Sequence, residues 1–203
     1  TVAFNSIVAE RYPQLVDEVN RREGEILAYG VDMGKIHHGE MAIEDETELV
    51  RQSVTSLRQA SGQAVTGWWS PARSESMNTL DLIAAEGIDY VCDWINDDLP
   101  YPIRTKNGPI HSMPISHDID DQTIISGYHH SEDNFVDQVC DAFDVHMADS
   151  KTHGGQIFTL TIHPWMSGQP HRVKALKKAL SHVMGSDGVW SATASEILDA
   201  FKK

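Results

Sequence analysis

The chain is poor in cysteine, in basic residues and in long apolar runs. It has 2 cysteines in 203 residues, and 16 Lys and Arg against 30 Asp and Glu, for a formal net charge of −14 at pH 7. A surface of that charge repels nucleic acids and anionic membranes. No apolar run has the length of a membrane-spanning helix, and no cleavable signal pattern opens the chain. We therefore expect a cytoplasmic protein that binds a small-molecule substrate and neither nucleic acid nor membrane.

The scarcity of cysteine also argues against a disulfide framework. Cys92 and Cys140 lie in apolar patterns typical of a strand and a helix, so we expect two buried thiols in a reducing compartment. No spacing resembles a Cys-x-x-Cys metal site. With 40% hydrophobic residues and no repeat, low-complexity segment or linker, the chain predicts a single domain over residues 1–203.

Predicted strands and helices alternate along nearly the whole chain. The expected strands cover about residues 2–4, 26–29, 64–68, 88–92, 111–115 and 156–162. The expected helices cover about residues 9–22, 44–60, 79–86, 131–147 and 171–184, with a last one from about 193. Repeated strand–helix units predict an α/β fold with a parallel sheet or barrel. Because residues 1–5 read as the inside of a strand, we expect part of the sheet to lie upstream.

Bulky and polar residues directly follow four of the predicted strands. They are Tyr29 and Gly30, residues 68–73, Asp93 with Trp94, and His163 with Pro164 and Trp165. The carboxyl ends of parallel strands meet on one face, which holds the active site in α/β folds. These residues therefore predict one shared pocket.

His163 is the strongest candidate for catalysis. It ends an apolar predicted strand, Pro164 directs the loop that follows, and Trp165 comes next. Imidazole titrates near neutral pH, so it can give a proton to a leaving nitrogen or take one from water. The alternative is a histidine that is hydrogen-bonded within the core.

Aspartates crowd the loop after the fourth predicted strand. Asp93, Asp97 and Asp98 lie close enough in sequence to raise one another's pKa and to act as a base or as partners of Arg or His. Asp93 is nearest the strand end, and we expect it to orient His163 or Arg73. We expect Asp97 and Asp98 to bind substrate. Ordinary surface acids are the alternative for each.

A second predicted substrate-binding group lies just after the third strand, and it comprises Trp69, Ser70, Pro71 and Arg73. Arg73 can hold a carboxylate or pair with the aspartates. The indole rings of Trp69 and Trp165 suit the face of a flat ring or a sugar. We expect Trp68 in the core, and backbone amides of residues 70–72 as oxyanion donors. In the alternative, Arg73 forms only a surface ion pair.

The adjacent histidines His37 and His38 are poor candidates for a metal site. Neighbouring histidines cannot easily both face one metal, and no carboxylate lies beside them at a suitable spacing. We predict no metal-binding residue from this pattern.

Four segments carry a resemblance to a known family: residues 5–13, 67–73, 90–101 and 162–164. Together they resemble the polysaccharide deacetylase (NodB-homology) superfamily, especially its allantoinase-like and cyclic-imide-hydrolase-like branch. The similarity covers essentially the whole chain, and the string of residues 90–101 is quite specific. It implies an incomplete (β/α) barrel that hydrolyses C–N bonds of amides, ureides or imides, with His163 as the catalytic acid.

Two features depart from the superfamily's pattern. Its first motif, an aspartate pair that supplies the catalytic base and a metal ligand, would lie upstream of Thr1. Where its second motif has two metal-binding histidines, this chain has Tyr29 and Met33. His37 or His38 can replace them only if the loop folds back. The resemblance therefore implies zinc only if a partner chain or an upstream segment supplies ligands.

Three functions are consistent with this resemblance. The first is a hydrolase of small amides, ureides or cyclic imides, and the second is a zinc-dependent de-N-acetylase of an amino sugar or polysaccharide. The third is a non-catalytic or complementing subunit of a split enzyme. An exposed barrel edge invites aggregation unless something pairs with it. We therefore expect a homo- or hetero-oligomer, or a chain that supplies the missing N-terminal strands.

Overall fold

The computed structural model describes all 203 residues, and the chain divides into two compact units. The first unit comprises residues 1–94, 100–113 and 192–203, and the second comprises residues 95–99 and 114–191. Each unit has its own apolar core. The expected single domain over residues 1–203 stays a prediction.

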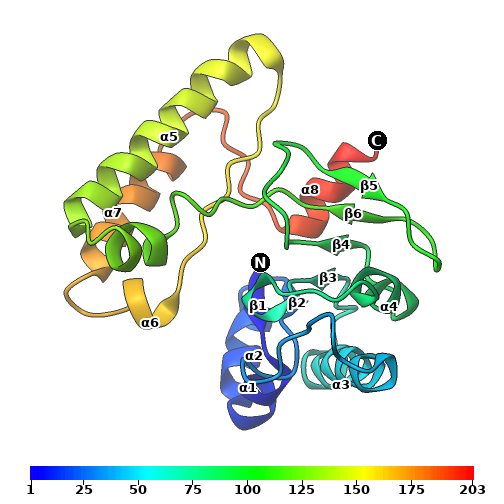
Figure 1. Ribbon diagram of the computed structural model, residues 1–203. Helices are drawn as coiled ribbons and strands as arrows, with labels where there is room; N and C mark the ends of the chain where they lie inside the picture. Colours follow the sequence, from blue (N-terminus) through cyan, green and yellow to red (C-terminus); the bar gives the residue numbers. More distant parts are fainter. The chain divides into compact units, whose positions relative to one another are not determined.

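A six-stranded sheet forms the centre of the first unit (Figure 1). Its order is β1 (Val2–Phe4), β2 (Ile26–Ala28), β3 (Gly67–Trp68), β4 (Tyr90–Val91), β6 (Ile110–Ser112) and β5 (Tyr101–Ile103). Neighbouring strands are parallel except for the antiparallel pair β5–β6. The sheet has two edges, β1 and β5, and does not close. The expected α/β fold of an incomplete (β/α) barrel is thus confirmed.

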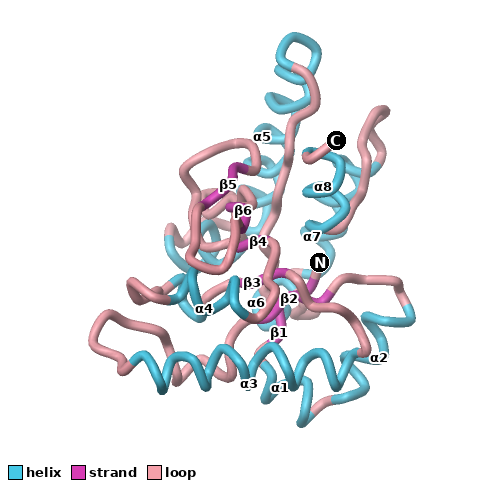
Figure 2. Tube along the Cα trace, turned by 90° about the vertical axis from the view of Figure 1, so that its right-hand side faces the viewer, coloured by secondary structure: helices cyan, strands magenta, loops and turns pink.

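Four helices line one face of this sheet (Figure 1, and from the side in Figure 2): α1 (Ser6–Arg11), α2 (Pro13–Arg21), α3 (Ile43–Ser61) and α4 (Thr79–Ala85). Helix α3 buries Val50, Val54 and Leu57, whose spacing puts them on one helical face. Gly62 ends it with a left-handed φ of 71°. Trp68 is fully buried in the same core, as expected.

Tyr90 joins the sheet to the last helix of the first unit, α8 (Ala194–Phe201). The buried Tyr90 hydroxyl donates to Glu25 at 2.8 Å, and Glu25 also accepts from the backbone N–H of Ser195 at 3.3 Å. A Cβ at Gly67 would lie 2.2 Å from Tyr90 Cζ. Only glycine therefore leaves room for this phenol ring.

The second unit is mainly helical, and α5 (Glu132–His153) packs against α7 (Val173–Met184) (Figure 1). It also contains the π-helical turn η2 (Gln122–Gly127) and the short helix α6 (Pro164–Ser167). Ser131 caps α5 as its position predicts, accepting from the Asn134 N–H at 3.2 Å. No helix of the structure combines the length and the apolar character needed to cross a bilayer.

Three elements differ from those predicted. The helix expected over residues 9–22 is two helices, because Pro13 has no N–H to donate and starts a new helix. β5 lies within the loop expected at residues 93–107, where Pro102 suits an edge strand. Residues 156–162 form no strand: none of their backbone groups pairs with a neighbouring strand, and such pairing is what stabilises a strand.

Candidate active site

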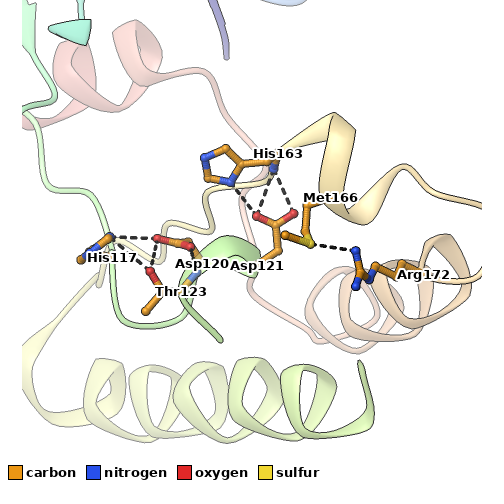
Figure 3. Close-up of polar contacts among 7 residues, drawn as sticks. All are labelled: His117, Asp120, Asp121, Thr123, His163, Met166 and Arg172. Carbon is orange, nitrogen blue, oxygen red and sulfur yellow. Dashed lines mark hydrogen bonds and ion pairs between the residues drawn. The ribbon is translucent and has the colours of Figure 1, made fainter. Parts of the chain in front are cut away.

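His163 and Asp121 form a hydrogen-bonded pair in the second unit (Figure 3). His163 Nδ1 lies 2.7 Å from Asp121 Oδ1, and the backbone N–H of His163 donates to Asp121 Oδ2 at 3.0 Å. Asp121 is fully buried, whereas the side chain of His163 is 28% exposed. A carboxylate on Nδ1 makes that nitrogen the donor and fixes the ring, which leaves Nε2 for a substrate.

The charges of this pair favour a protonated imidazole. The hydrogen bond to Asp121 raises the pKa of His163 above its usual value, against the smaller opposing effect of burial. Burial alone would raise the pKa of Asp121, but hydrogen bonds from His163 and Ser167 outweigh burial and hold it below its usual value. Both shifts favour an imidazolium beside a carboxylate, and an imidazolium can donate a proton.

Local structure on both sides holds the pair in place. Asp121 immediately precedes η2, and His163 is the N-cap residue of α6, whose first residue is Pro164. The Trp165 ring lies beside the imidazole, with centroids 5.7 Å apart and planes tilted by 59°. Trp165 is 57% exposed. Its position suits the predicted role as a pocket wall, which stays a prediction.

Asp120, Asp121 and His163 are the residues of this chain best placed to hold a metal, since their donor atoms lie within 4.8 Å of one another. However, Asp120 already accepts from His117 at 2.9 Å and from the Thr123 N–H at 2.5 Å (Figure 3). Asp121 is likewise bonded to His163. A cation bound to these carboxylates would compete with the hydrogen bonds that they already accept.

Asp97 and Asp98 line a cavity of about 380 Å³ in the second unit. His117 and His146 also line it. His117 Nδ1 bonds Asp120, the neighbour of Asp121, so the cavity wall is connected to the pair of His163 and Asp121 by one hydrogen bond and one peptide unit. Substrate binding by Asp97 and Asp98 stays a prediction.

The remaining predicted site residues gather in the first unit. The Ser70 N–H donates to Asp93 Oδ1 at 2.6 Å, and Asp93 is only 6% exposed. The Trp69 and Tyr29 rings lie 5.6 Å apart. Pro71 packs on Gly30, where a Cβ would lie 2.4 Å from Pro71 Cγ. Within the first unit, the structure therefore brings the ends of β2, β3 and β4 together, as predicted.

The backbone N–H groups of residues 70–72, the expected oxyanion donors, have partners within the chain. The Ser70 N–H is bonded to Asp93, Pro71 has no N–H, and the Ala72 N–H donates to the hydroxyl oxygen of Tyr29. Ala72 and Arg73 adopt left-handed φ values of 56° and 54°, which cost energy in residues other than glycine. The Ser70 and Ala72 N–H groups already have acceptors in this structure, and the expectation of an oxyanion hole here stays a prediction.

The positions that match the superfamily's metal-binding histidines do not fit zinc. Burial and the nearby Asp93 raise the pKa of Tyr29, which keeps it a neutral phenol, and Met33 is half exposed. His37 is buried with its Nδ1 on Glu46 Oε1 at 2.9 Å, which leaves only its Nε2 as a possible ligand atom. Zinc bound by this chain alone at that motif is therefore not supported by its donor set.

The sequence did not single out Asp121, whose carboxylate bonds His163 Nδ1. Asp93 instead accepts from Ser70, and its predicted role toward Arg73 stays a prediction. Asp121 follows no predicted strand and lies in an irregular stretch. The only signal was the acidic run Asp118-Ile119-Asp120-Asp121.

Similar proteins were found by sequence and by structure, although no protein-family model matches this chain. A Schizosaccharomyces pombe protein named "Putative polysaccharide deacetylase" is 28% identical over 177 residues, which cover 78% of this chain and 54% of that protein. The structure of PuuE allantoinase matches with a TM-score of 0.87 and 24% identity, over 98% of this chain and 67% of that one.

A third match is the structure of a "probable polysaccharide deacetylase" from Pseudomonas aeruginosa, with a TM-score of 0.85 and 26% identity. It covers 97% of this chain and 65% of the other. The chain thus spans about half of the curated relative and about two thirds of the solved structures. The resemblance predicted from the motifs is confirmed: this chain has the fold, and part of the sequence pattern, of the polysaccharide deacetylase superfamily with its allantoinase-like hydrolases.

Proposed function

We propose that this chain carries the acid-catalytic part of a hydrolase that cleaves a non-peptide C–N bond in a small amide, ureide or cyclic imide. The observation that carries the proposal is the 2.7 Å bond between Asp121 and Nδ1 of a partly exposed His163. It supplies an imidazolium whose second nitrogen is free to face a substrate.

The reaction requires one proton to reach the leaving nitrogen. Water adds to the substrate carbonyl carbon and forms a C–O bond, the C=O π electrons move onto the carbonyl oxygen, and the proton that the water loses passes to solvent, which gives a tetrahedral intermediate; a proton from solvent restores the imidazolium after each turnover. When the C–N bond breaks, the electron pair goes to nitrogen, and His163 Nε2 donates its proton there. Asp121 stabilises the imidazolium before this transfer and keeps the ring aimed. The exposed Trp165 ring can contact a flat substrate face.

The names of the similar proteins support this reaction class. They are an allantoinase and two proteins named as polysaccharide deacetylases, and these are names of hydrolases. The test is to measure release of ammonia or amine from a ureide, a cyclic imide and an N-acetylated amino sugar, using the longest protein that contains this chain. Turnover of a ureide or imide supports the proposal. Absence of turnover with all three contradicts it.

A zinc-dependent de-N-acetylase is the second candidate, favoured by the name of the Schizosaccharomyces pombe protein. It requires ligands from outside this chain, because Tyr29 and Met33 do not provide them. Metal analysis of the purified protein separates the two candidates. One zinc per active site, with activity lost on chelation, supports the deacetylase.

Replacing Asp121 by asparagine should lower activity and move its pH dependence. Asp121→Asn removes the charge that raises the pKa of His163, so less imidazolium is present at neutral pH. We expect kcat to fall by about 100- to 10,000-fold, as for loss of an orienting carboxylate. The alkaline fall of kcat/KM should move to lower pH, because the protonated form now persists only at lower pH.

The matched control is Asp144→Asn. Asp144 also bonds a histidine at 2.7 Å, but its partner His182 lies on the surface beside α5. Activity of that variant should stay near the wild-type value. An Asp121→Asn enzyme with unchanged kcat and pH profile would contradict the proposed role of the pair.

A further inference from the structure

Asp93 has a buried oxygen that no N–H or hydroxyl group of the chain satisfies. Oδ1 accepts from the Ser70 N–H at 2.6 Å, whereas Oδ2 is buried without a donor. Leaving a buried carboxylate oxygen unpaired costs about 1–3 kcal/mol or more. A buried oxygen of this kind in a folded protein indicates a missing donor, and a neighbouring carboxyl group that carries a proton is such a donor.

The neighbouring group that can supply this donor is the carboxyl of Glu75. Its side chain lies within hydrogen-bonding reach of Asp93. Glu75 Oε1 accepts from the indole N–H of Trp94 at 3.1 Å, which leaves Oε2 to carry a proton. A carboxyl group donates only when it is protonated. The contacts of both residues are therefore satisfied together when the pair holds one proton.

We propose that Glu75 and Asp93 form a carboxyl pair that shares one proton at neutral pH, and that this pair positions the turn at residues 70–73. Glu75 donates to Asp93 Oδ2, and Asp93 Oδ1 holds the Ser70 N–H. The turn bears Trp69 at one end and Arg73 at the other, which are predicted substrate-binding residues. The part of this inference that concerns substrate rests on the proposed function.

The surrounding charges explain why the proton stays on Glu75. Burial and then Asp93 raise the pKa of Glu75 to about 8, and the carboxylate of Glu46 acts in the same direction. Burial also raises the pKa of Asp93, but the Ser70 N–H and the nearby His37 favour its charged form. The shared proton is therefore held by Glu75, with the negative charge on Asp93.

Loss of that proton should loosen the strained turn. Above about pH 8 the pair would carry two adjacent negative charges, and Glu75 could no longer donate to Asp93. Asp93 is the acceptor that holds the Ser70 N–H, and Ala72 and Arg73 remain left-handed only while such contacts constrain them. The pair therefore positions the turn only while it holds its proton, that is, below about pH 8.

The indole N–H of Trp94 provides a direct probe, because it bonds Glu75. In ¹H–¹⁵N spectra its cross-peak can be assigned by its absence in Trp94→Phe. We expect this peak to shift with a midpoint near pH 8 in the wild-type protein and to stay fixed between pH 6.5 and 9.5 in Glu75→Gln. The glutamine amide can still donate to Asp93 and accept from Trp94, so this variant keeps the contacts without the titration.

Two controls make the result specific. The cross-peak of Trp190, which is 61% exposed and unrelated to the pair, should show no transition near pH 8. Asp121→Asn should leave the Trp94 transition in place, because it alters only the titration of His163. A Trp94 peak that does not move in the wild-type protein, or that moves equally in Glu75→Gln, would overturn the carboxyl pair.

Stability offers a second, independent measurement. Because the pKa of Glu75 is raised in the folded state, its protonation stabilises the fold most below the unfolded value of about 4.5. That contribution is lost as pH rises toward about 8. The free energy of unfolding of Glu75→Gln minus that of the wild type should therefore grow from pH 5 to 8 and then level off. A difference that is constant over this range would contradict the inference.

The activity measurement separates this inference from the proposed function. With a confirmed substrate, the wild-type kcat/KM should show a loss near pH 8 in addition to the alkaline fall caused by His163, and Glu75→Gln should remove only the loss near pH 8. A Trp94 transition in a protein that hydrolyses no C–N substrate would support the pair and refute the proposed function. Hydrolysis of a C–N substrate without any Trp94 transition would support the proposed function and refute the carboxyl pair.

Discussion

His163→Ala should reduce kcat by about 100- to 10,000-fold on a substrate that the wild-type protein hydrolyses, the usual contribution of a general acid. The change removes the only imidazole bonded to Asp121 and leaves the buried carboxylate without its ring partner. KM should change little, because the proton is transferred only in the transition state. Steady-state kinetics across pH 5–9 measure both parameters.

His182→Ala is the matched control for this prediction. Its ring also bonds an aspartate at 2.7 Å, but the pair of His182 and Asp144 is exposed. We expect activity close to wild type. If His163→Ala retained full activity on a confirmed substrate, or if both histidine variants lost activity equally, His163 would not be the acid.

The second large effect concerns stability. Glu46→Ala should destabilise the protein by about 3–5 kcal/mol, the cost of removing one member of a buried charged network. Glu46 is fully buried and accepts from His37 at 2.9 Å, and from Ser76 and Thr79 at 2.5 Å each. The variant leaves the buried His37 and Thr79 and the partly buried Ser76 without their acceptor, and urea-induced unfolding measures the loss.

Glu48, two residues further along the same helix, provides the control. It pairs with Arg51 on the exposed side of α3, so Glu48→Ala should cost less than about 1 kcal/mol. The stability that Glu46 contributes also depends on pH, and the direction of that dependence follows from the shift of its pKa. Burial alone would raise the pKa of Glu46, but hydrogen bonds from Ser76, Thr79 and His37 hold it below its usual value, so its contribution is lost as pH falls through that value. Equal effects of Glu46→Ala and Glu48→Ala would contradict this account.

Much of the fold could be predicted because its elements carry local signals. The stripe of Val50, Val54 and Leu57 predicts α3, and Thr193 with Glu196 forms the capping box expected at α8. The failures depend on distant partners. Residues 156–162 have an apolar pattern typical of a strand, yet a strand also needs a neighbour, and no local pattern reveals whether one is present.

Some residues of the candidate site could be predicted from the sequence and others could not, for a similar reason. His163 has a clear signal, an apolar run followed by Pro164. Its partner Asp121 is 42 residues away in sequence and outside any regular pattern, so only the three-dimensional structure shows the pair. Glu75 reads as an ordinary loop acid, and its burial beside Asp93 was not predictable from spacing. The expectation that the predicted residues of both units share one pocket stays a prediction.

The central claim is that Asp121 keeps His163 protonated near neutral pH, and histidine NMR measures this without any substrate. Titration of the His163 ring signals, assigned with His163→Ala, should give a pKa above the usual 6.5 in the wild-type protein. The value should be lower in Asp121→Asn. A wild-type pKa at or below 6.5, or one that Asp121→Asn leaves unchanged, would contradict the account.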